Sequence, residues 1–300
     1  NLSEEDEREL NVRLNKSGGE WDMDILANEF DVVDLKEWGF KDIELGFNID
    51  KIVEGNTEDD HIPEVKESRV KLGEVWELGK HRLMCGDSTK ESDVEKLMNG
   101  HKADMIHTDP PYNVNYEGGS KKREVIKNDS LSNFNQFLLD AFTIGNKNIK
   151  KGGAIYVWHA SMETHNFIKE LLNAGFLYKS CIIWNKNNST FGRSDYHWKH
   201  EPCFYGWKEG AAHKWNGDRK QSTVWDIERP SRSESHPTMK PIDLCKIAIK
   251  NSSKTKDIVL DIFLGSGSTL IACEKTNRVC YGMELDTKYC DVIIERWEQF

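Results

Sequence analysis

Short apolar runs alternate with amphipathic stretches from residue 70 to the end of the chain. Strands are predicted where an apolar run is bounded by polar or turn-forming residues: 75–78, 81–85, 103–108, 153–158, 176–184, 258–263 and 279–285. Helices are predicted where apolar positions recur at helical spacing: 89–98, 134–149, 162–174, 242–250, 270–275 and 287–298. Strands separated by helices of this length are typical of a parallel sheet covered by helices, so an α/β domain is predicted here.

The first 67 residues have a different pattern. Their apolar positions are spaced as in helices, and residues 48–63 are polar and acidic, as in a linker. We therefore expect a small helical N-terminal segment over 1–67, joined to an α/β domain over 68–300. The alternative is that Trp21, Phe30 and Trp38 pack on the α/β domain.

The net charge of −10 is unevenly distributed along the chain. Residues 1–100 contain 27 acidic against 13 basic side chains, whereas the remaining residues contain 24 against 28. An acidic N-terminal part thus masks a mildly basic second part, and a nucleic-acid partner for the second part stays open.

The cysteines and the lack of long apolar runs bear on the compartment. Seven cysteines are scattered without a C-x-x-C pair, which favours reduced thiols over disulfides or a metal site. No apolar run approaches the roughly 20 residues that span a bilayer. We expect a cytoplasmic protein without a membrane segment and without a bound metal.

Asp109-Pro110-Pro111-Tyr112 directly follows the predicted strand 103–108. Two consecutive prolines fix the backbone and leave the carbonyls of Asp109 and Pro110 in a rigid turn. A carboxylate, a carbonyl and an aromatic ring together suit a planar substrate with an exocyclic amine, which would donate its hydrogens to the two acceptors. The alternative is a tight turn with a surface tyrosine.

A second turn, Phe263-Leu264-Gly265-Ser266-Gly267, lies between a predicted strand and a predicted helix. Glycines at such a turn let the backbone approach a ligand, and Glu284, at the end of the next strand, could accept the hydroxyls of a ribose. A dinucleotide such as NAD requires a further glycine where this chain has Leu270. The pattern therefore favours a cofactor with a single nucleoside.

Three segments together resemble a known family. Asp-Pro-Pro-Tyr at 109–112, His-Pro-Thr-x-Lys-Pro at 236–241 and Phe-x-Gly-x-Gly at 263–267 occur in the order found in beta-class, permuted amino-methylating DNA methyltransferases. The resemblance covers about residues 70–300. It implies a Rossmann-like methyltransferase sheet with helices on both faces, S-adenosylmethionine as methyl donor and N6 of adenine as acceptor. The segment 14–22 separately resembles the tail that follows ParB-like domains in some phage proteins.

The resemblance also implies roles for individual residues. Asp109, Pro110, Pro111 and Tyr112 would form the catalytic turn around the target amine. The residues expected to bind the cofactor are Asp87, Thr238, Lys240, Phe263, Gly265, Ser266, Gly267 and Glu284. Asp87 could instead be a helix cap and Lys240 a solvated lysine, while the side chain of Leu264 must point away from the ligand.

Double-stranded DNA is the expected partner, with its target base flipped out of the helix. Aromatic and basic residues gather in the stretch 185–235, the candidate target-recognition region, and 115–130 has the composition of a mobile lid. The residues expected to contact DNA are Lys121, Lys122, Arg123, Arg193, Lys199, Lys214, Arg219 and Lys220. Near the target pocket the resemblance places Tyr196, His197, Trp198, His200 and Glu201, each of which could equally be a core or hairpin residue.

Other functions remain open at this stage. N4-methylation of cytosine would use the same chemistry, and a non-catalytic DNA-binding relative would keep the fold. C5-methylation of cytosine needs a cysteine nucleophile after a proline, and the Pro202-Cys203 pair lacks the neighbouring residue that this chemistry requires, so Cys203 is predicted to be a strand residue. A homodimer stays open as the assembly.

Overall fold

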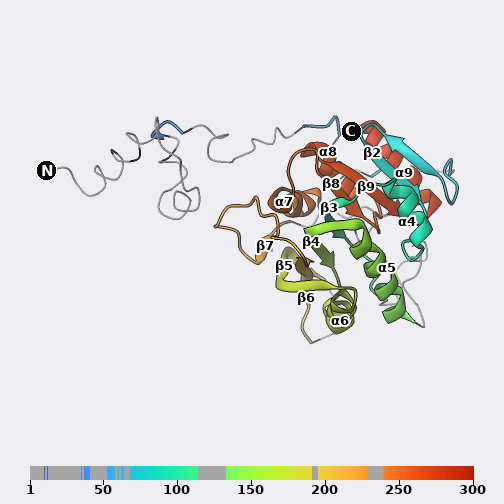
Figure 1. Cartoon of the computed structure of the whole chain (residues 1–300), viewed down its shortest axis with the longest axis horizontal. Helices are drawn as coiled ribbons and strands as arrows, with labels where there is room; N and C mark the ends of the chain where they lie inside the picture. The colour runs from blue at the N-terminus through green and yellow to red at the C-terminus, as the bar shows by residue number, and fades with distance from the viewer. Residues whose placement is uncertain are drawn as a thin grey trace. The chain divides into compact units, whose positions relative to one another are not determined.

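The computed structural model describes residues 68–113, 133–190, 195–228 and 239–300, with shorter pieces between 10 and 63. The chain divides into two compact units, residues 1–50 and 51–300 (Figure 1). In the first unit, Val12, Leu35 and Phe40 are buried against one another, and Trp38 packs beside them. The described part of the N-terminal segment therefore has a small apolar cluster of its own, whereas Trp21 and Phe30 lie outside the described residues.

One sheet organises the described residues of the second unit. Its nine strands have the order β1-β2-β9-β8-β3-β4-β6-β5-β7. They are β1 (Val75–Leu78), β2 (His81–Cys85), β3 (Ala103–Thr108), β4 (Ile149–Trp158), β5 (Phe176–Thr190), β6 (Trp198–Lys208), β7 (Val224–Asp226), β8 (Ile258–Asp261) and β9 (Val279–Glu284). The strands from β2 to β4 pair in parallel, so the α/β prediction is confirmed and the parallel arrangement holds for the centre of the sheet.

The sheet is mixed because β5 continues to Thr190 and is followed shortly afterwards by β6. Such a short connection produces an antiparallel pair, and β6 accordingly runs antiparallel to both β5 and β4. The stretch 185–235, which interrupts the predicted alternation, thus contributes to the same sheet. Cys203 lies buried on β6, which confirms its prediction as a strand residue.

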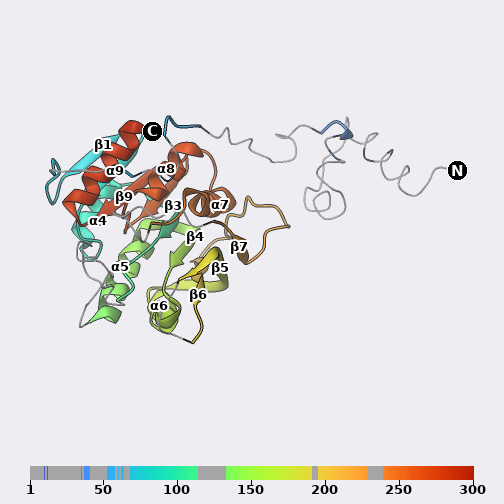
Figure 2. The same ribbon diagram turned by 180° about the vertical axis from the view of Figure 1, so that it is seen from behind.

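Helices cover both faces of the sheet, as predicted (Figures 1 and 2). On one face lie α4 (Glu91–Met98), α5 (Phe134–Asn148) and α6 (Thr164–Asn173), the last preceded by the 3₁₀ turn η1 (Ser161–Glu163). On the other face lie α7 (Ile242–Ser252), α8 (Ser268–Lys275) and α9 (Thr287–Gln299). Among these helices of the described residues, none has the length and apolar character needed to cross a membrane.

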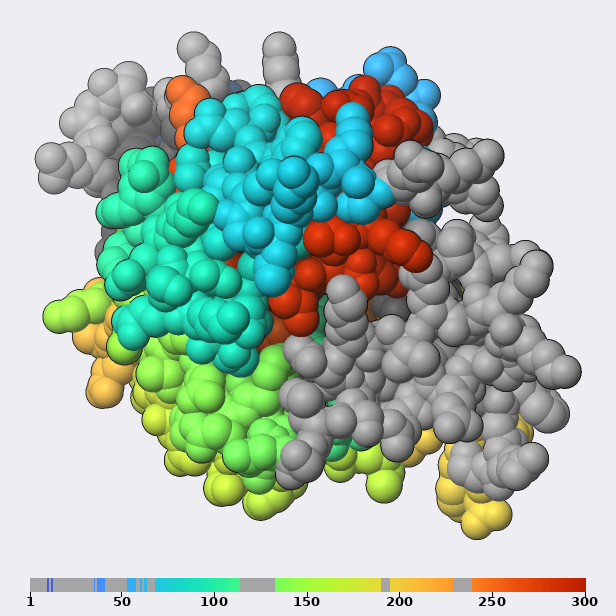
Figure 3. All heavy atoms as spheres, turned by 90° about the vertical axis from the view of Figure 1, so that its right-hand side faces the viewer, coloured from blue at the N-terminus to red at the C-terminus, as the bar shows by residue number. Residues whose placement is uncertain are grey.

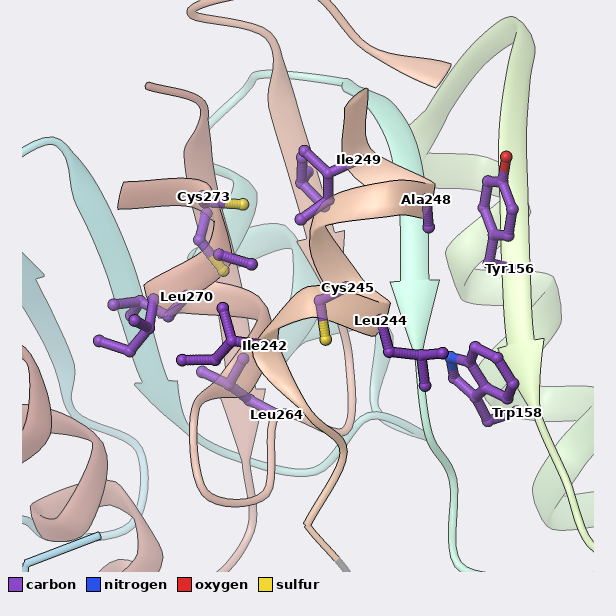
Figure 4. Close-up of a cluster of buried hydrophobic side chains, with 14 of the residues drawn as sticks. Tyr156, Trp158, Ile242, Leu244, Cys245, Ala248, Ile249, Leu264, Leu270 and Cys273 are labelled. Carbon is purple, nitrogen blue, oxygen red and sulfur yellow. The ribbon is translucent and has the colours of Figure 1, made fainter. Parts of the chain in front are cut away.

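The core beneath α7 and α8 is apolar and closely packed (Figure 4). Leu244 of α7 lies beside Trp158 of β4, and both are fully buried. Leu270 of α8 is also fully buried, so the position at which a dinucleotide-binding turn needs glycine is occupied here by a core side chain.

Residues just before β1 are tied to the last helix. The buried carboxylate of Asp291 on α9 accepts hydrogen bonds from the Ser68 hydroxyl and from the Arg69 and Val70 amides. Figure 3 shows this side of the molecule, where atoms from the region of β1 and β2 (cyan) lie against the C-terminal helix (red).

Residues 53–60 also belong to the second unit. The Val53 amide donates to the Lys275 carbonyl, and the Asn56 amide donates to the Phe300 carbonyl, each at 2.9 Å. The predicted boundary at residue 67 therefore lies inside the second compact unit, which begins at Lys51.

Candidate active site

Three neighbouring parallel strands deliver the candidate residues to one edge of the sheet. β3 ends at Thr108 directly before the Asp109 turn, β8 ends at Asp261 before the glycine turn, and β9 ends at Glu284. β8 pairs with both β3 and β9. Because the carboxyl ends of adjacent parallel strands meet at one edge, the two predicted turns and Glu284 share that edge.

Lys240 and Tyr112 engage both carboxylate oxygens of Asp109. The Lys240 ammonium lies 2.6 Å from Oδ2 of Asp109, and the Tyr112 hydroxyl donates to Oδ1 at 2.5 Å. The Lys240 ammonium also lies 3.0 Å from the Tyr112 hydroxyl. Lys240, 131 residues from Asp109 in sequence, is therefore part of the surroundings of the candidate catalytic carboxylate.

A second carboxylate, that of Glu201 on β6, completes this network. Its Oε1 lies 2.8 Å from the Lys240 ammonium and accepts a hydrogen bond from the Tyr112 hydroxyl at 2.6 Å. Its Oε2 lies 2.8 Å from the Lys186 ammonium. Two carboxylates and two ammonium groups thus balance in charge, and the Tyr112 hydroxyl has one proton to share between the two carboxylates.

Burial and charge move the pKa values of these groups in different directions. Burial raises the pKa of Asp109, and the Lys240 ammonium opposes this rise only in part. Burial acts the same way on Glu201, but Lys240 and Lys186 outweigh it and lower its pKa to about 2. Burial alone would lower the pKa of Lys240, yet the two carboxylates hold it above its usual range. Asp109 is thus the carboxylate better able to take up a proton.

The Tyr112 ring packs edge-on against Phe167 of α6, with ring centroids 6.2 Å apart. Its hydroxyl stays protonated because burial and the neighbouring carboxylates raise its pKa. Stacking of this ring on a substrate base remains a prediction.

The glycine turn and Glu284 form the adjoining part of the site. Gly265 has φ +56° and Gly267 has φ +87°, both in the left-handed region that favours glycine. The Glu284 carboxylate accepts from the Gly265 amide at 2.9 Å and from the Asp286 amide at 2.8 Å. A side chain added at Gly265 would meet nothing within 4 Å, so the space in front of this turn is open to a ligand.

The side chains around Gly265 point in different directions. Leu264 is buried in the core and lies so close to Gly282 of β9 that a Cβ at Gly282 would come within 2.3 Å of it. The prediction that Leu264 points away from the ligand is therefore confirmed (Figure 4). Phe263 packs against Phe137 of α5, with ring centroids 5.6 Å apart, and the Ser266 carbonyl accepts from the Arg296 guanidinium at 2.9 Å.

Asp87 follows β2 close to this turn, because the Gly86 amide donates to the Glu284 carbonyl at 3.0 Å. The Asp87 carboxylate accepts from the amide and the hydroxyl of Thr89, at 3.0 and 2.7 Å. These bonds close a turn before α4, whose N-cap residue is Lys90 and has no side-chain capping bond, so the alternative that Asp87 is a helix cap is wrong. Binding of an adenine ring by Asp87 remains a prediction.

The residues expected to contact DNA that the structure describes are not gathered in one place. Lys214 pairs with Asp104 at 2.9 Å, at the end of β3 opposite to Asp109, and the nearby Asn216 amide bonds to Asn251 near the end of α7. Lys199 is exposed at the start of β6, and Arg219 and Lys220 are exposed beyond Lys214. Outside the described residues lie Thr238 of the cofactor set, the whole stretch 115–130, and four residues of the DNA set: Lys121, Lys122, Arg123 and Arg193.

Two ion pairs of the site had no signal in the sequence. Glu201 was expected near the target pocket, but its pairing with Lys240 and Lys186 depends on how β5, β6 and the segment before α7 meet in space.

Asp261 joins the Asp109 turn and the glycine turn. Its carboxylate accepts from the Thr108 hydroxyl at 2.7 Å and from the Phe263 amide at 3.1 Å. The apolar setting of Asp261 at the end of a buried strand was the one available sign of such a role.

Comparison with protein families identifies the class. Residues 103–295 match the family model described as DNA methylase of the N6/N4 type, so the chain belongs to the N6/N4 DNA methylase family. It is accordingly a DNA methyltransferase, and this family uses S-adenosylmethionine. The fold and cofactor predictions are confirmed at this level.

The sequence identities to individual relatives are low. The chain is 26% identical to the type II methyltransferase M.HpaI of Haemophilus parainfluenzae over 238 residues, which cover 72% of this chain and 73% of the relative. It is 28% identical to the DNA adenine methyltransferase YhdJ of Escherichia coli K12 over 249 residues, covering 71% and 81%.

Solved structures show the same fold. The M1.HpyAVI–SAM complex superimposes with a TM-score of 0.57 at 23% identity, covering 71% of this chain and 97% of that one. The PvuII cytosine-N4-specific DNA methyltransferase superimposes with a TM-score of 0.54 at 15% identity, covering 74% and 94%.

A branched side chain at Gly265 should block cofactor binding. Gly265→Val places atoms in the open space before the turn, and we expect calorimetry to show no binding of S-adenosylmethionine by the folded variant. Gly100→Val is the matched control, because Gly100 also has positive φ (+79°) and open space around it but precedes β3 at the opposite edge of the sheet. Equal affinities in the two variants would contradict the assignment of Gly265.

Cofactor affinity should also depend on pH through Glu284. Burial raises the pKa of this carboxyl to about 7, although the Asp286 and Gly265 amides oppose the rise. If Glu284 binds the ribose as predicted, the ribose hydroxyls donate to its ionised form, so binding lowers this pKa and affinity falls as the pH drops below it. We expect roughly tenfold weaker binding at pH 6 than at pH 8, and Glu284→Gln should bind weakly with no such dependence. Equal wild-type affinity at both pH values would contradict this assignment.

Proposed function

We propose that this protein is a site-specific methyltransferase that transfers the methyl group of S-adenosylmethionine to N6 of adenine in double-stranded DNA. The observation that carries the proposal is the position of Asp109, half-buried at the carboxyl edge of β3, the edge that it shares with the glycine turn and Glu284. A carboxylate in this place can accept a hydrogen from an amine next to a nucleoside cofactor.

The chemistry follows from the two acceptors of the Asp109 turn. The amine lone pair of adenine is delocalised into its ring and attacks poorly. If the Asp109 carboxylate and the Pro110 carbonyl accept its two hydrogens, the nitrogen becomes more nearly tetrahedral and its lone pair is freed for attack. S-adenosylmethionine supplies a methyl group on a sulfonium sulfur, which retains the bonding electron pair as a neutral thioether. The methylated nitrogen then loses one proton. Asp109 is the nearest acceptor for this proton and passes it on to solvent.

Lys240 and Tyr112 prepare Asp109 for this role. Both hold the carboxylate in one orientation before the substrate arrives, and such preorganisation lowers the barrier of the chemical step. Glu201 in turn holds Lys240 and Tyr112.

Transfer to C5 of cytosine is disfavoured by the state of Cys203. Burial raises the pKa of its thiol well above the usual range, which disfavours the thiolate that this reaction needs as nucleophile. Transfer to an amine requires no covalent bond to the protein.

The target base would have to leave the duplex to reach Asp109. Two described parts of the candidate recognition region lie next to the site: Lys186 on β5 and the start of β6, which leads from Lys199 into Glu201. The proposal includes contacts between DNA phosphates and the other basic residues of the predicted set.

Sequencing DNA from a host that expresses the protein, with a method that reports modified bases in context, tests the proposal. N6-methyladenine at one recurring sequence is the expected result. N4-methylcytosine at such a sequence would support the alternative raised by the fold of the PvuII enzyme, which is cytosine-N4-specific. Unmodified DNA together with intact cofactor binding would support a non-catalytic relative.

A further inference from the structure

The segment that carries Lys240 leads directly into α7, whose first amide needs a hydrogen-bond acceptor. The first amides of a helix have no partner within the helix, and a side chain at the N-cap position often supplies one. Here the N-cap residue is Pro241, whose side chain makes no capping bond. Another part of the chain must therefore provide the acceptor.

Asp60 provides it from a position 182 residues earlier. Its Oδ1 accepts a hydrogen bond from the Ile242 amide at 3.1 Å. A carboxylate at this end of a helix is also favoured by the helix dipole. The cap of α7 thus comes from the segment before the α/β domain.

Three contacts hold this upstream segment against the α/β domain. Besides the backbone bonds of Val53 and Asn56, the Glu54 carboxylate lies 3.0 Å from the buried Lys275 ammonium. Gly55 lies against the Phe300 ring so closely that a Cβ would meet the ring within 2.4 Å. Residues 53–57 therefore lie at the ends of α8 and α9, and Asp60 lies at the beginning of α7.

Lys240 itself is fixed from two sides. On one side the Ser268 hydroxyl donates to the Lys240 carbonyl at 2.8 Å. On the other side Pro241 joins it to the helix start that Asp60 caps. The ammonium of Lys240 then reaches Asp109 at 2.6 Å, so a shift in the start of α7 would move the group that orients Asp109.

We propose that Asp60 is a positioning residue for methyl transfer, acting through the start of α7 on Lys240 and thereby on Asp109. The inference rests on the proposed function. It gives Asp60, which lies in a stretch with the composition of a linker, a part in orienting the catalytic carboxylate.

Full-length Asp60→Ala tests this proposal. We expect kcat at 25 °C to fall by about tenfold, since small displacements of orienting groups have large effects on rate. Affinity for S-adenosylmethionine, measured by calorimetry, should stay within about twofold, because the glycine turn and Glu284 are not touched. Asp60→Asn keeps an accepting oxygen and should restore most of kcat.

Two further variants separate positioning from general stability. Asp243→Ala removes an acidic side chain from the first turn of the same helix, where it is 67% exposed and pairs with Lys246, and should leave kcat unchanged. Lys240→Gln should itself be impaired, and adding Asp60→Ala to it should lower kcat no further, because the effect of Asp60 passes through Lys240.

Each other outcome has a distinct meaning. A lower melting temperature in Asp60→Ala with unchanged kcat would overturn the positioning role and leave only a helix cap. An additional loss of kcat in the double variant would show that Asp60 acts by another route, which also overturns it. Wild-type protein that transfers no methyl group to any DNA would overturn the proposed function itself.

Discussion

Replacing Asp109 with alanine is expected to lower kcat for methyl transfer by about 100-fold or more. The variant loses the acceptor that would orient the target amine and take up its proton, and removal of one such positioned group typically has this effect. Steady-state transfer of labelled methyl groups to DNA that contains the recognition sequence measures it.

Cofactor binding supplies the internal control for this variant. Asp109 contacts Lys240 and Tyr112, whereas Glu284 and Gly265 contact each other on the neighbouring strands. Calorimetry should therefore show nearly unchanged affinity for S-adenosylmethionine. Near wild-type kcat in Asp109→Ala would refute the catalytic assignment.

Lys240→Met should be the most destabilising substitution in the site. It leaves the largely buried carboxylates of Asp109 and Glu201, which are 27% and 13% exposed, beside the Tyr112 hydroxyl without the ammonium that they share. Breaking a buried ion pair by removing one partner commonly costs about 3–5 kcal/mol of the free energy of unfolding. Chemical denaturation at pH 8 should show a loss of this size, together with a large fall in kcat.

The pH dependence of this loss has a definite sign. In the wild-type protein the pKa of Glu201 is lowered to about 2, so its stabilising contribution is present above its unfolded value near 4.5 and disappears as the pH falls below it. Without Lys240 the folded-state pKa values of both carboxyls rise, and stability is lost as the pH increases. The deficit of Lys240→Met relative to wild type should grow from pH 5 to pH 8.

A matched pair of variants checks this explanation. Lys186→Met removes an ammonium that contacts Glu201, whereas Lys240 contacts both Glu201 and Asp109, so it should destabilise less and affect kcat less. Adding Glu201→Gln to Lys240→Met removes one buried charge and should recover part of the stability. A deficit of Lys240→Met that is independent of pH would contradict the electrostatic account.

Much of the fold was predictable because local patterns and tertiary packing agree. The predicted strands 75–78 and 81–85 coincide with β1 and β2, and the predicted helices lie within a few residues of α4 to α9. The mixed order of the sheet was not predictable in the same way. Whether β6 pairs with β4 as well as with β5 depends on contacts between distant segments. Such contacts produce no periodic pattern of apolar residues in the sequence.

The candidate site likewise combines local motifs, which could be predicted, with contacts between distant residues, which could not. Motifs of consecutive residues, such as Asp109–Tyr112 and Phe263–Gly267, could be placed at strand ends from the sequence. Pairs such as Lys240 with Asp109, or Asp60 with the Ile242 amide, join residues 131 and 182 positions apart. A lysine before a helix or an aspartate in an acidic stretch has no distinguishing pattern, so these contacts require the folded structure.

The contact between Lys240 and Asp109 also bears on discrimination among the four bases. A base that enters the site meets a carboxylate whose oxygens are already engaged by an ammonium and a hydroxyl. In the proposed reaction, an exocyclic amine can compete for those oxygens because it brings hydrogens of its own. The exocyclic oxygens of thymine carry no hydrogens and would face Asp109 as further acceptors. Thymine would therefore be excluded from the site before any methyl transfer could begin.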